Sequence, residues 1–150
     1  MSKYMNLIGQ NARKASLEKI NAKVKNKILK KYASLLDKER NSIIIENTKD
    51  IKFALKKKLK NNLIDRLTIN HKKLDNIKNS INKIIKLKDP VDNTLEKWSR
   101  PNGLKIKRVS IPIGVIAVIY ESRPNVTSDV ASLCFKSGNA VILKGGSEAI

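Results

Sequence analysis

Two short polar segments each follow an apolar run near the end of this 150-residue sequence. "YESRPN" (120–125) comes after "VIAVI", and "KGGS" (144–147) comes after "AVIL". The first segment offers a phenol, a carboxylate, a guanidinium and a carboxamide, which are groups that bind substrates or polarise a carbonyl. The second offers an ammonium and glycine backbone amides, which suit a phosphate or ribose at a helix start. Taken alone, "KGGS" is equally a tight turn with an exposed lysine.

The pattern around these segments predicts that they lie at one edge of a parallel sheet. The apolar runs 115–120 and 140–143 have the length of buried strands, and "SDVASLCFKSG" between them has helical spacing and ends on Gly138. Strand, helix, strand is the βαβ unit, in which ligands bind beyond the carboxyl ends of the strands. We expect Ser147 to cap a further helix. The standard glycine-rich phosphate motifs are absent from the sequence.

The first hundred residues carry helical apolar stripes. The stripes predict helices over 13–37, 44–59 and 74–85, the first through Leu17, Ile20, Val24, Ile28, Tyr32 and Leu35. Residues 90–103 contain two prolines and a glycine and are expected to be a connection. "LKIKRVSI" (104–111) alternates apolar and basic residues, which predicts an edge strand whose lysines discourage aggregation.

The formal net charge of +19 raises the question of a nucleic-acid partner. Most of the excess lies in the first hundred residues, but only 6 of the 32 basic residues are arginine and aromatic residues make up 4%. Nucleic-acid proteins favour arginine forks and stacking rings. The abundance of lysine, isoleucine and asparagine indicates A/T-rich codons instead, with the lysines on solvated helix faces. A basic nucleic-acid-binding module and a structural helical module stay open as alternatives.

Several features point to a reducing, cytoplasmic setting. The single cysteine, Cys134, excludes an internal disulfide, and its place on the apolar side of a helix suggests a small hydrophobe. The longest apolar run, 115–120, is too short to cross a membrane. We expect no metal site, and we interpret His71 as a surface or capping residue at a helix start.

The segments "VIYESRPNVT" and "GNAVILKGGSEA" resemble the gamma-glutamyl phosphate reductases of the aldehyde dehydrogenase superfamily, and "NLIDRLTI" and "DPV" fit the same pattern. The resemblance implies an α/β fold with an N-terminal helical region and connection (1–103) and an oligomerisation or edge strand (104–112). Residues 113–150 would then begin a Rossmann-like unit that binds a nicotinamide cofactor. Since two parallel strands do not make a stable covered sheet, we expect the front part of a longer protein.

The reaction implied by the resemblance is the NADPH-dependent reduction of gamma-glutamyl phosphate to glutamate-5-semialdehyde, a step of proline biosynthesis. A cysteine thiolate attacks the acyl carbon, phosphate leaves, and hydride resolves the thioester. That cysteine lies beyond residue 150 in the family, and Cys134 is not its equivalent, so the 150 residues alone are expected to be inactive. The resemblance also implies a homo-oligomer and a contact with the preceding kinase of the pathway, with no membrane and no nucleic acid.

The resemblance also carries over individual residues. Lys144 matches a lysine that holds the cofactor ribose or its phosphate, and a polar residue at Ser147, where many superfamily members have Glu, leans toward NADPH over NADH, although Glu148 follows. Asn125 matches an oxyanion-hole asparagine, while Arg123 is expected to bind a substrate carboxylate or phosphate, or else to form a structural salt bridge. The cofactor-binding set is Tyr120, Glu121, Ser122, Lys144, Gly145, Gly146 and Ser147, in which Glu121 has no separate role.

Overall fold

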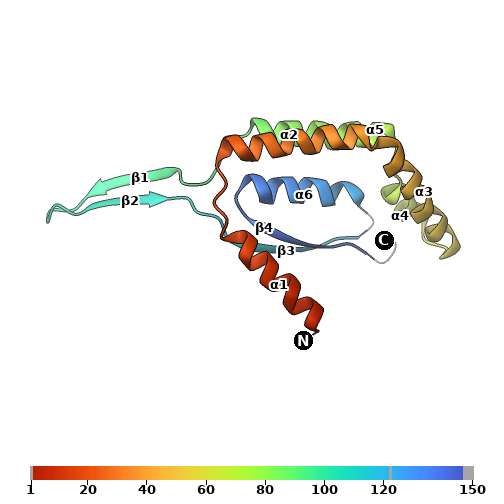
Figure 1. The fold of residues 1–150 in the computed structure, drawn as a ribbon, viewed down its shortest axis with the longest axis horizontal. Helices are drawn as coiled ribbons and strands as arrows, with labels where there is room; N and C mark the ends of the chain where they lie inside the picture. The colour runs from red at the N-terminus through yellow and green to blue at the C-terminus, as the bar shows by residue number, and fades with distance from the viewer. Residues whose placement is uncertain (1, 122, 147–150) are drawn as a thin grey trace.

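A computed structural model describes residues 2–121 and 123–146, and within them the chain forms six helices and four strands (Figure 1). The helices are α1 (Lys3–Ser16), α2 (Ala22–Lys38), α3 (Arg40–Lys56), α4 (Asn61–Leu67), α5 (His71–Lys86) and α6 (Pro124–Lys136). The strands are β1 (Thr94–Ser99), β2 (Lys105–Val109), β3 (Val115–Ile119) and β4 (Ala140–Lys144). The expected α/β class, with helices first and strands later, is confirmed.

Strands β3 and β4 pair in parallel and are joined by α6, so the predicted βαβ unit is confirmed. The register runs from Val115 opposite Ala140 to Ile119 opposite Lys144. Helix α6 lies over one face of the pair, and α1 lies against the other (Figure 1). The expectation that both strands are buried on both faces is wrong at the carboxyl end of β3, because Ile119 is 78% exposed.

The core lies where α2 and α5 pack side by side above α6 (Figure 1). Its buried members come from α2 and α5, and Phe135 of α6 packs against them. They are Leu29, Ala33, Leu74, Ile77, Ile81 and Ile84. Full burial of one large aliphatic side chain stabilises a fold by about 1.5–3 kcal/mol. The stripe predicted for α5 is therefore the stripe that builds the core.

The single helix expected over 13–37 is wrong, because the chain breaks after Ser16 and starts again at Ala22. Asn21 caps the second helix by accepting a hydrogen bond from the Val24 backbone N–H at 3.0 Å. The apolar spacing continues across the break, which is why the pattern alone does not reveal it.

The buried face of α2 also differs from the predicted stripe. Lys25, Leu29 and Ala33 are buried, whereas the stripe residues Val24, Ile28 and Leu35 are all more than 40% exposed. Leu29 and Ala33 belong to the core, and on the same face the Lys25 ammonium forms an ion pair with Asp89 2.9 Å away. Burial of these three residues leaves the neighbouring stripe residues facing outward.

Residues 90–103 are not only a connection, because they contain β1, which pairs antiparallel with β2. All six residues of β1 are exposed, so "TLEKWS" lacks the alternation that would predict a strand. The hairpin projects away from the helices (Figure 1). Helix α4, with seven residues, is likewise too short to show an apolar stripe.

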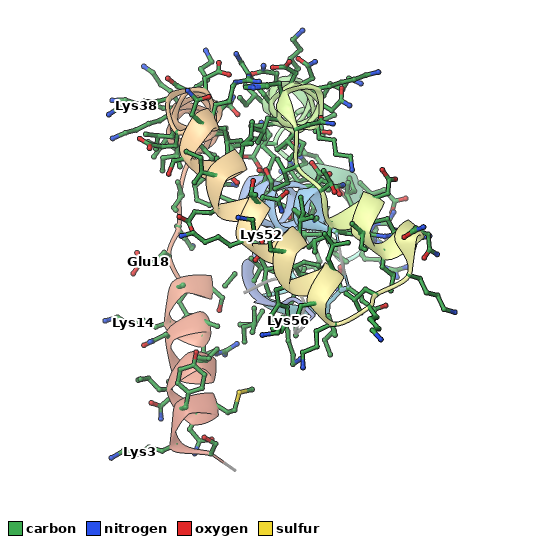
Figure 2. The ribbon with its side chains drawn as sticks, turned by 90° about the vertical axis from the view of Figure 1, so that its right-hand side faces the viewer. Lys3, Lys14, Glu18, Lys38, Lys52 and Lys56 are labelled. Carbon is green, nitrogen blue, oxygen red and sulfur yellow. The ribbon has the colours of Figure 1, made fainter. Side chains whose placement is uncertain are left out.

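Two lysines are buried, contrary to the expectation of solvated lysine faces. The ammonium of Lys136 donates to Asn26 Oδ1 at 2.7 Å and to the Ile85 carbonyl at 3.2 Å. Together with the pair of Lys25 and Asp89, it connects α6 and α2 to the end of α5. Other lysines do point outward, as Lys38 of α2 and Lys52 and Lys56 of α3 show (Figure 2). Among the residues described, no helix has the length and apolar character to span a membrane.

The turn between α6 and β4 generates a stability prediction at Gly138, whose φ is +73°. A Cβ there would lie 3.0 Å from Pro112 Cγ and 3.2 Å from Val91 Cγ2. We predict that Gly138→Ala lowers the free energy of unfolding by at least about 1–2 kcal/mol in urea denaturation. Gly9→Ala is the control, since its site in α1 is open, and it is expected to raise stability by about 0.5–1 kcal/mol. Equal effects of the two substitutions would refute the assigned backbone at Gly138.

A pH prediction follows from Asp89. Burial raises its pKa, but the Val91 N–H and the Lys25 ammonium lower it more, so the pKa in the fold lies below its ordinary value. A depressed carboxyl pKa stabilises the fold above about pH 4, and that stability is lost as the pH falls through the folded-state pKa. We predict that Asp89→Asn destabilises the neutral protein by about 3 kcal/mol, since it leaves Lys25 buried without a counter-charge.

The same variant should also lose less stability than the parent between about pH 5 and pH 2, measured by urea unfolding across that range. Asp37, whose pKa is lowered by hydrogen bonds from Lys78 and Arg40, keeps part of the acid sensitivity in both proteins. An unchanged acid dependence in Asp89→Asn would show that this pair does not contribute to it.

Candidate functional site

The two polar segments meet at the carboxyl ends of β3 and β4. The backbone N–H of Tyr120 donates to the Lys144 carbonyl at 3.0 Å, which extends the pairing one step beyond β3. The Tyr120 hydroxyl forms a short hydrogen bond with Thr127 Oγ1, so the ring is held against the second turn of α6. A Cβ on Gly145 would lie 3.8 Å from that ring.

A cavity of about 480 Å³ opens beside this junction. On one side it is lined by the segment ends and the start of α6, through Tyr120, Arg123, Thr127, Ser128, Gly145 and Gly146. On the other side α2, α3 and α5 supply Tyr32, Asn47 and Ile77 among others. Tyr120, Arg123, Gly145 and Gly146, which the sequence nominated separately, therefore face one cavity.

A second cavity of about 410 Å³ is formed by α4, α5 and the start of α6. Arg123 and Pro124 line both cavities, so the two are neighbours that share the beginning of α6. Asn125 and Asp129 line only the second cavity, across from Arg66 and Lys73. The candidate oxyanion residue and the candidate cofactor residues thus lie on different sides of one helix start.

Helix α6 begins at Pro124, earlier than the helical spacing of "SDVASLCFKSG" indicates. Proline suits this first helical position because its missing N–H is not needed there. Asn125 is therefore in the first turn of the helix, exposed, with its Nδ2 3.4 Å from Asp129 Oδ2. That distance is long for a hydrogen bond, so the amide is weakly held.

Not all nominated residues face these cavities. Lys144 is exposed at the end of β4, and Glu121 is exposed between the strand and the helix; neither lines either of these two cavities. Ser122, Ser147 and Glu148 lie outside the described residues. His71 is the first residue of α5, and its carbonyl accepts from Arg40 Nη1 at 3.1 Å.

Sequence reasoning missed the polar residues in the second and third turns of α6. Ser128 Oγ, Asp129 Oδ1 and Ser132 Oγ are buried and have no hydrogen-bond partner among the described residues. Unpartnered buried polar atoms are rare and call for an explanation. The signal was available, since polar residues recur at spacings of one and three within an otherwise apolar helix.

Cys134 is buried at 7% exposure, and burial raises the pKa of its thiol. A thiol with a raised pKa carries little of the thiolate that acts as a nucleophile. Its interpretation as a small hydrophobe therefore agrees with its position. The described residues contain no cluster of three or more histidine, cysteine or acidic side chains able to hold a metal ion.

This arrangement is the N-terminal part of an aldehyde dehydrogenase fold, and solved structures agree. A putative aldehyde dehydrogenase from Bacillus subtilis superposes on 92% of the chain with a TM-score of 0.65, at 18% identity, over 29% of its own length. At that identity the likeness concerns the fold alone. A scan against protein-family models finds no match.

Similarity at the sequence level is more specific. A gamma-glutamyl phosphate reductase structure from Thermotoga maritima has a TM-score of 0.89 and 42% identity, over 93% of this chain and 34% of that one. The gamma-glutamyl phosphate reductase of Nautilia profundicola is 51% identical over 131 residues, which is 87% of this chain and 32% of the relative. The chain is thus homologous to the N-terminal part of the gamma-glutamyl phosphate reductases and spans about a third of their length.

Proposed function

We propose that the two polar segments bind the cofactor and stabilise the acyl oxygen in an enzyme that reduces gamma-glutamyl phosphate to glutamate-5-semialdehyde. NADPH is the reductant and phosphate is the second product. The observation that carries the proposal is the junction of Tyr120 and Lys144, which gathers both polar segments at one sheet edge. The support for the particular substrate is the homology to proteins named for it.

The residues at the sheet edge fit a nicotinamide dinucleotide phosphate. Lys144 is exposed at the carboxyl end of β4, where its ammonium can reach a ribose phosphate. Gly145 and Gly146 line the cavity beside Tyr120, so cofactor and aromatic ring can lie close together. We assign binding of this cofactor to Tyr120, Glu121, Ser122, Lys144, Gly145, Gly146 and Ser147. When bound, the cofactor would supply the hydride.

Asn125 is proposed to donate to the acyl oxygen. Its carboxamide has two N–H donors, and one of them has only the long contact to Asp129. A donor placed where negative charge develops stabilises the tetrahedral intermediates. Arg123 lines both cavities and is exposed, so it is proposed to bind an anionic group of the substrate.

The nucleophile in this proposal is a cysteine other than Cys134, located in the part that corresponds to the remaining two thirds of the relatives. Its thiolate forms a bond to the acyl carbon, and phosphate leaves with the electrons of the carbon–oxygen bond. Hydride then adds to the thioester carbon, and the thiolate departs to leave the aldehyde. Asn125 donates a hydrogen bond to the acyl oxygen of the substrate in both steps.

The setting proposed for this enzyme is cytoplasmic and homo-oligomeric, with a contact to the kinase that makes the acyl phosphate. The hairpin of β1 and β2, projecting from the body, is the proposed oligomer element (Figure 1). A nucleic-acid-binding role is not favoured. The labelled lysines point to solvent from three different helices, α1, α2 and α3, and do not form one recognition helix (Figure 2). The acidic side chain of Glu18 lies between those of α1 and α2.

Lys144 provides the test of this function. Residues 1–150 would replace the matching third of the Thermotoga maritima reductase, and steady-state kinetics would be measured with gamma-glutamyl phosphate. We predict NADPH-dependent turnover, and a KM for NADPH raised about tenfold or more by Lys144→Ala, as expected for a lost charge-assisted bond. The KM for NADH, which has no 2′-phosphate, should change little.

Lys88→Ala is the matched control, since Lys88 is exposed and distant in sequence from both polar segments. A folded hybrid with no turnover would contradict the proposed reaction. Equal effects of Lys144→Ala on NADPH and NADH would contradict the assignment of Lys144 to the phosphate.

A further inference from the structure

The cavity of about 410 Å³ contains charges of both signs. Arg66, Lys73 and Arg123 bring positive charge to its lining, and Asp65 and Asp129 bring negative charge. The ammonium of Lys73 already donates to the Asp65 carbonyl. A lining with both signs suits a ligand that is itself a zwitterion, such as the head group of an α-amino acid.

Asp129 carries a buried oxygen, Oδ1, that the described residues leave without a hydrogen-bond partner. Its other oxygen, Oδ2, has among the described residues the 3.4 Å contact with Asn125. Among the described residues the ion pairs do not include it. It is also beyond the first turn of α6, where the helix dipole would help. A cationic group on a ligand would neutralise the Asp129 carboxylate and donate to its unpartnered oxygen.

The separation of Asn125 and Asp129 along α6 is compatible with a glutamyl group bound lengthwise. The two residues are four apart, so their Cβ atoms lie on the same face of the helix about 5–6 Å apart, and their polar ends, Asn125 Nδ2 and Asp129 Oδ2, are 3.4 Å apart. In a γ-glutamyl group, four covalent bonds separate the acyl carbon from the α-nitrogen, and the extended span is about 5 Å. With the acyl oxygen at Asn125, the α-ammonium falls one helical turn along, at Asp129.

We propose that Asp129 binds the α-ammonium of the amino-acid substrate and so selects substrates that carry it. This inference rests on the proposed function for the place of the acyl oxygen. The α-carboxylate then faces the cationic side of the cavity, formed by Arg66 and Lys73. A substrate lacking the amino group would leave the Asp129 carboxylate buried and uncompensated, which is a strong basis for rejection.

The test measures binding to the chain itself, so its outcome does not depend on catalysis. Amide chemical shifts of residues 1–150 would be followed by NMR during titration with L-glutamate γ-methyl ester, a stable acyl analogue. We predict shifts in the first two turns of α6, with a dissociation constant in the millimolar range. Glutarate monomethyl ester, which lacks the amino group, should bind at least about tenfold more weakly.

Asp129→Asn keeps the shape of the side chain and removes its charge. It should weaken binding of the glutamate ester at least about tenfold, whereas the glutarate ester should bind at least as tightly as it does to the parent. Asp92→Asn is the control for loss of one negative charge. Asp92 lies outside the cavity with a φ of +57°, a conformation that asparagine accepts. This control should bind both esters like the parent.

Three results would overturn the inference: equal binding of the two esters, an equal loss for both esters in Asp129→Asn, or no shift up to about 50 mM of the glutamate ester. The second result would mean that Asp129 only holds Asn125 in place. The proposed reaction is judged separately, by turnover of the hybrid enzyme, so either idea can fail without the other.

Discussion

The parallel pairing of β3 with β4 brings the two polar segments of the candidate site to one edge of the sheet. At the start of the pair, Gly114 receives a hydrogen bond from the Ala140 N–H and donates to Asn139 Oδ1. At the far end, the Tyr120 N–H reaches the Lys144 carbonyl. Because both strands run the same way, their carboxyl ends share one edge, and the chain must cross over through a helix to make the pair.

That crossover helix is held in place by unusual anchors. Its last turn is tied to α2 and α5 by the buried Lys136 ammonium, and next to it Lys25 pairs with Asp89. Buried charges are expensive to desolvate, so they fix one arrangement more than they add stability. With its end fixed, α6 presents its first turns, with Asn125 and Asp129, to the cavity of about 410 Å³ that it lines together with α4 and α5.

Much of this arrangement can be predicted from the sequence. Apolar runs bounded by a helical stretch predict the βαβ unit, and the α5 stripe predicts the core, because in both cases apolar burial decides the structure. The face of α2 is different. It includes a lysine, Lys25, whose partner Asp89 lies 64 residues away, and no local periodicity indicates such a pair. The exposed strand β1 is likewise invisible to patterns that depend on burial.

The candidate site, like the fold, could be predicted only in part from the sequence. Tyr120 and the two glycines after β4 could be placed together because strand order dictates it. The role of Asp129 could not be predicted, since it depends on α6 starting at Pro124 and on a buried oxygen that has no hydrogen-bond partner among the described residues. Both are properties of packing across distant segments.

A crystal structure of the hybrid enzyme with NADPH and a γ-glutamyl analogue tests the central claim most directly. The account predicts the 2′-phosphate within hydrogen-bond distance of Lys144 Nζ, the acyl oxygen on Asn125 Nδ2, and the two ligands on opposite sides of the start of α6. A cofactor phosphate bound away from the ends of β3 and β4 would contradict it.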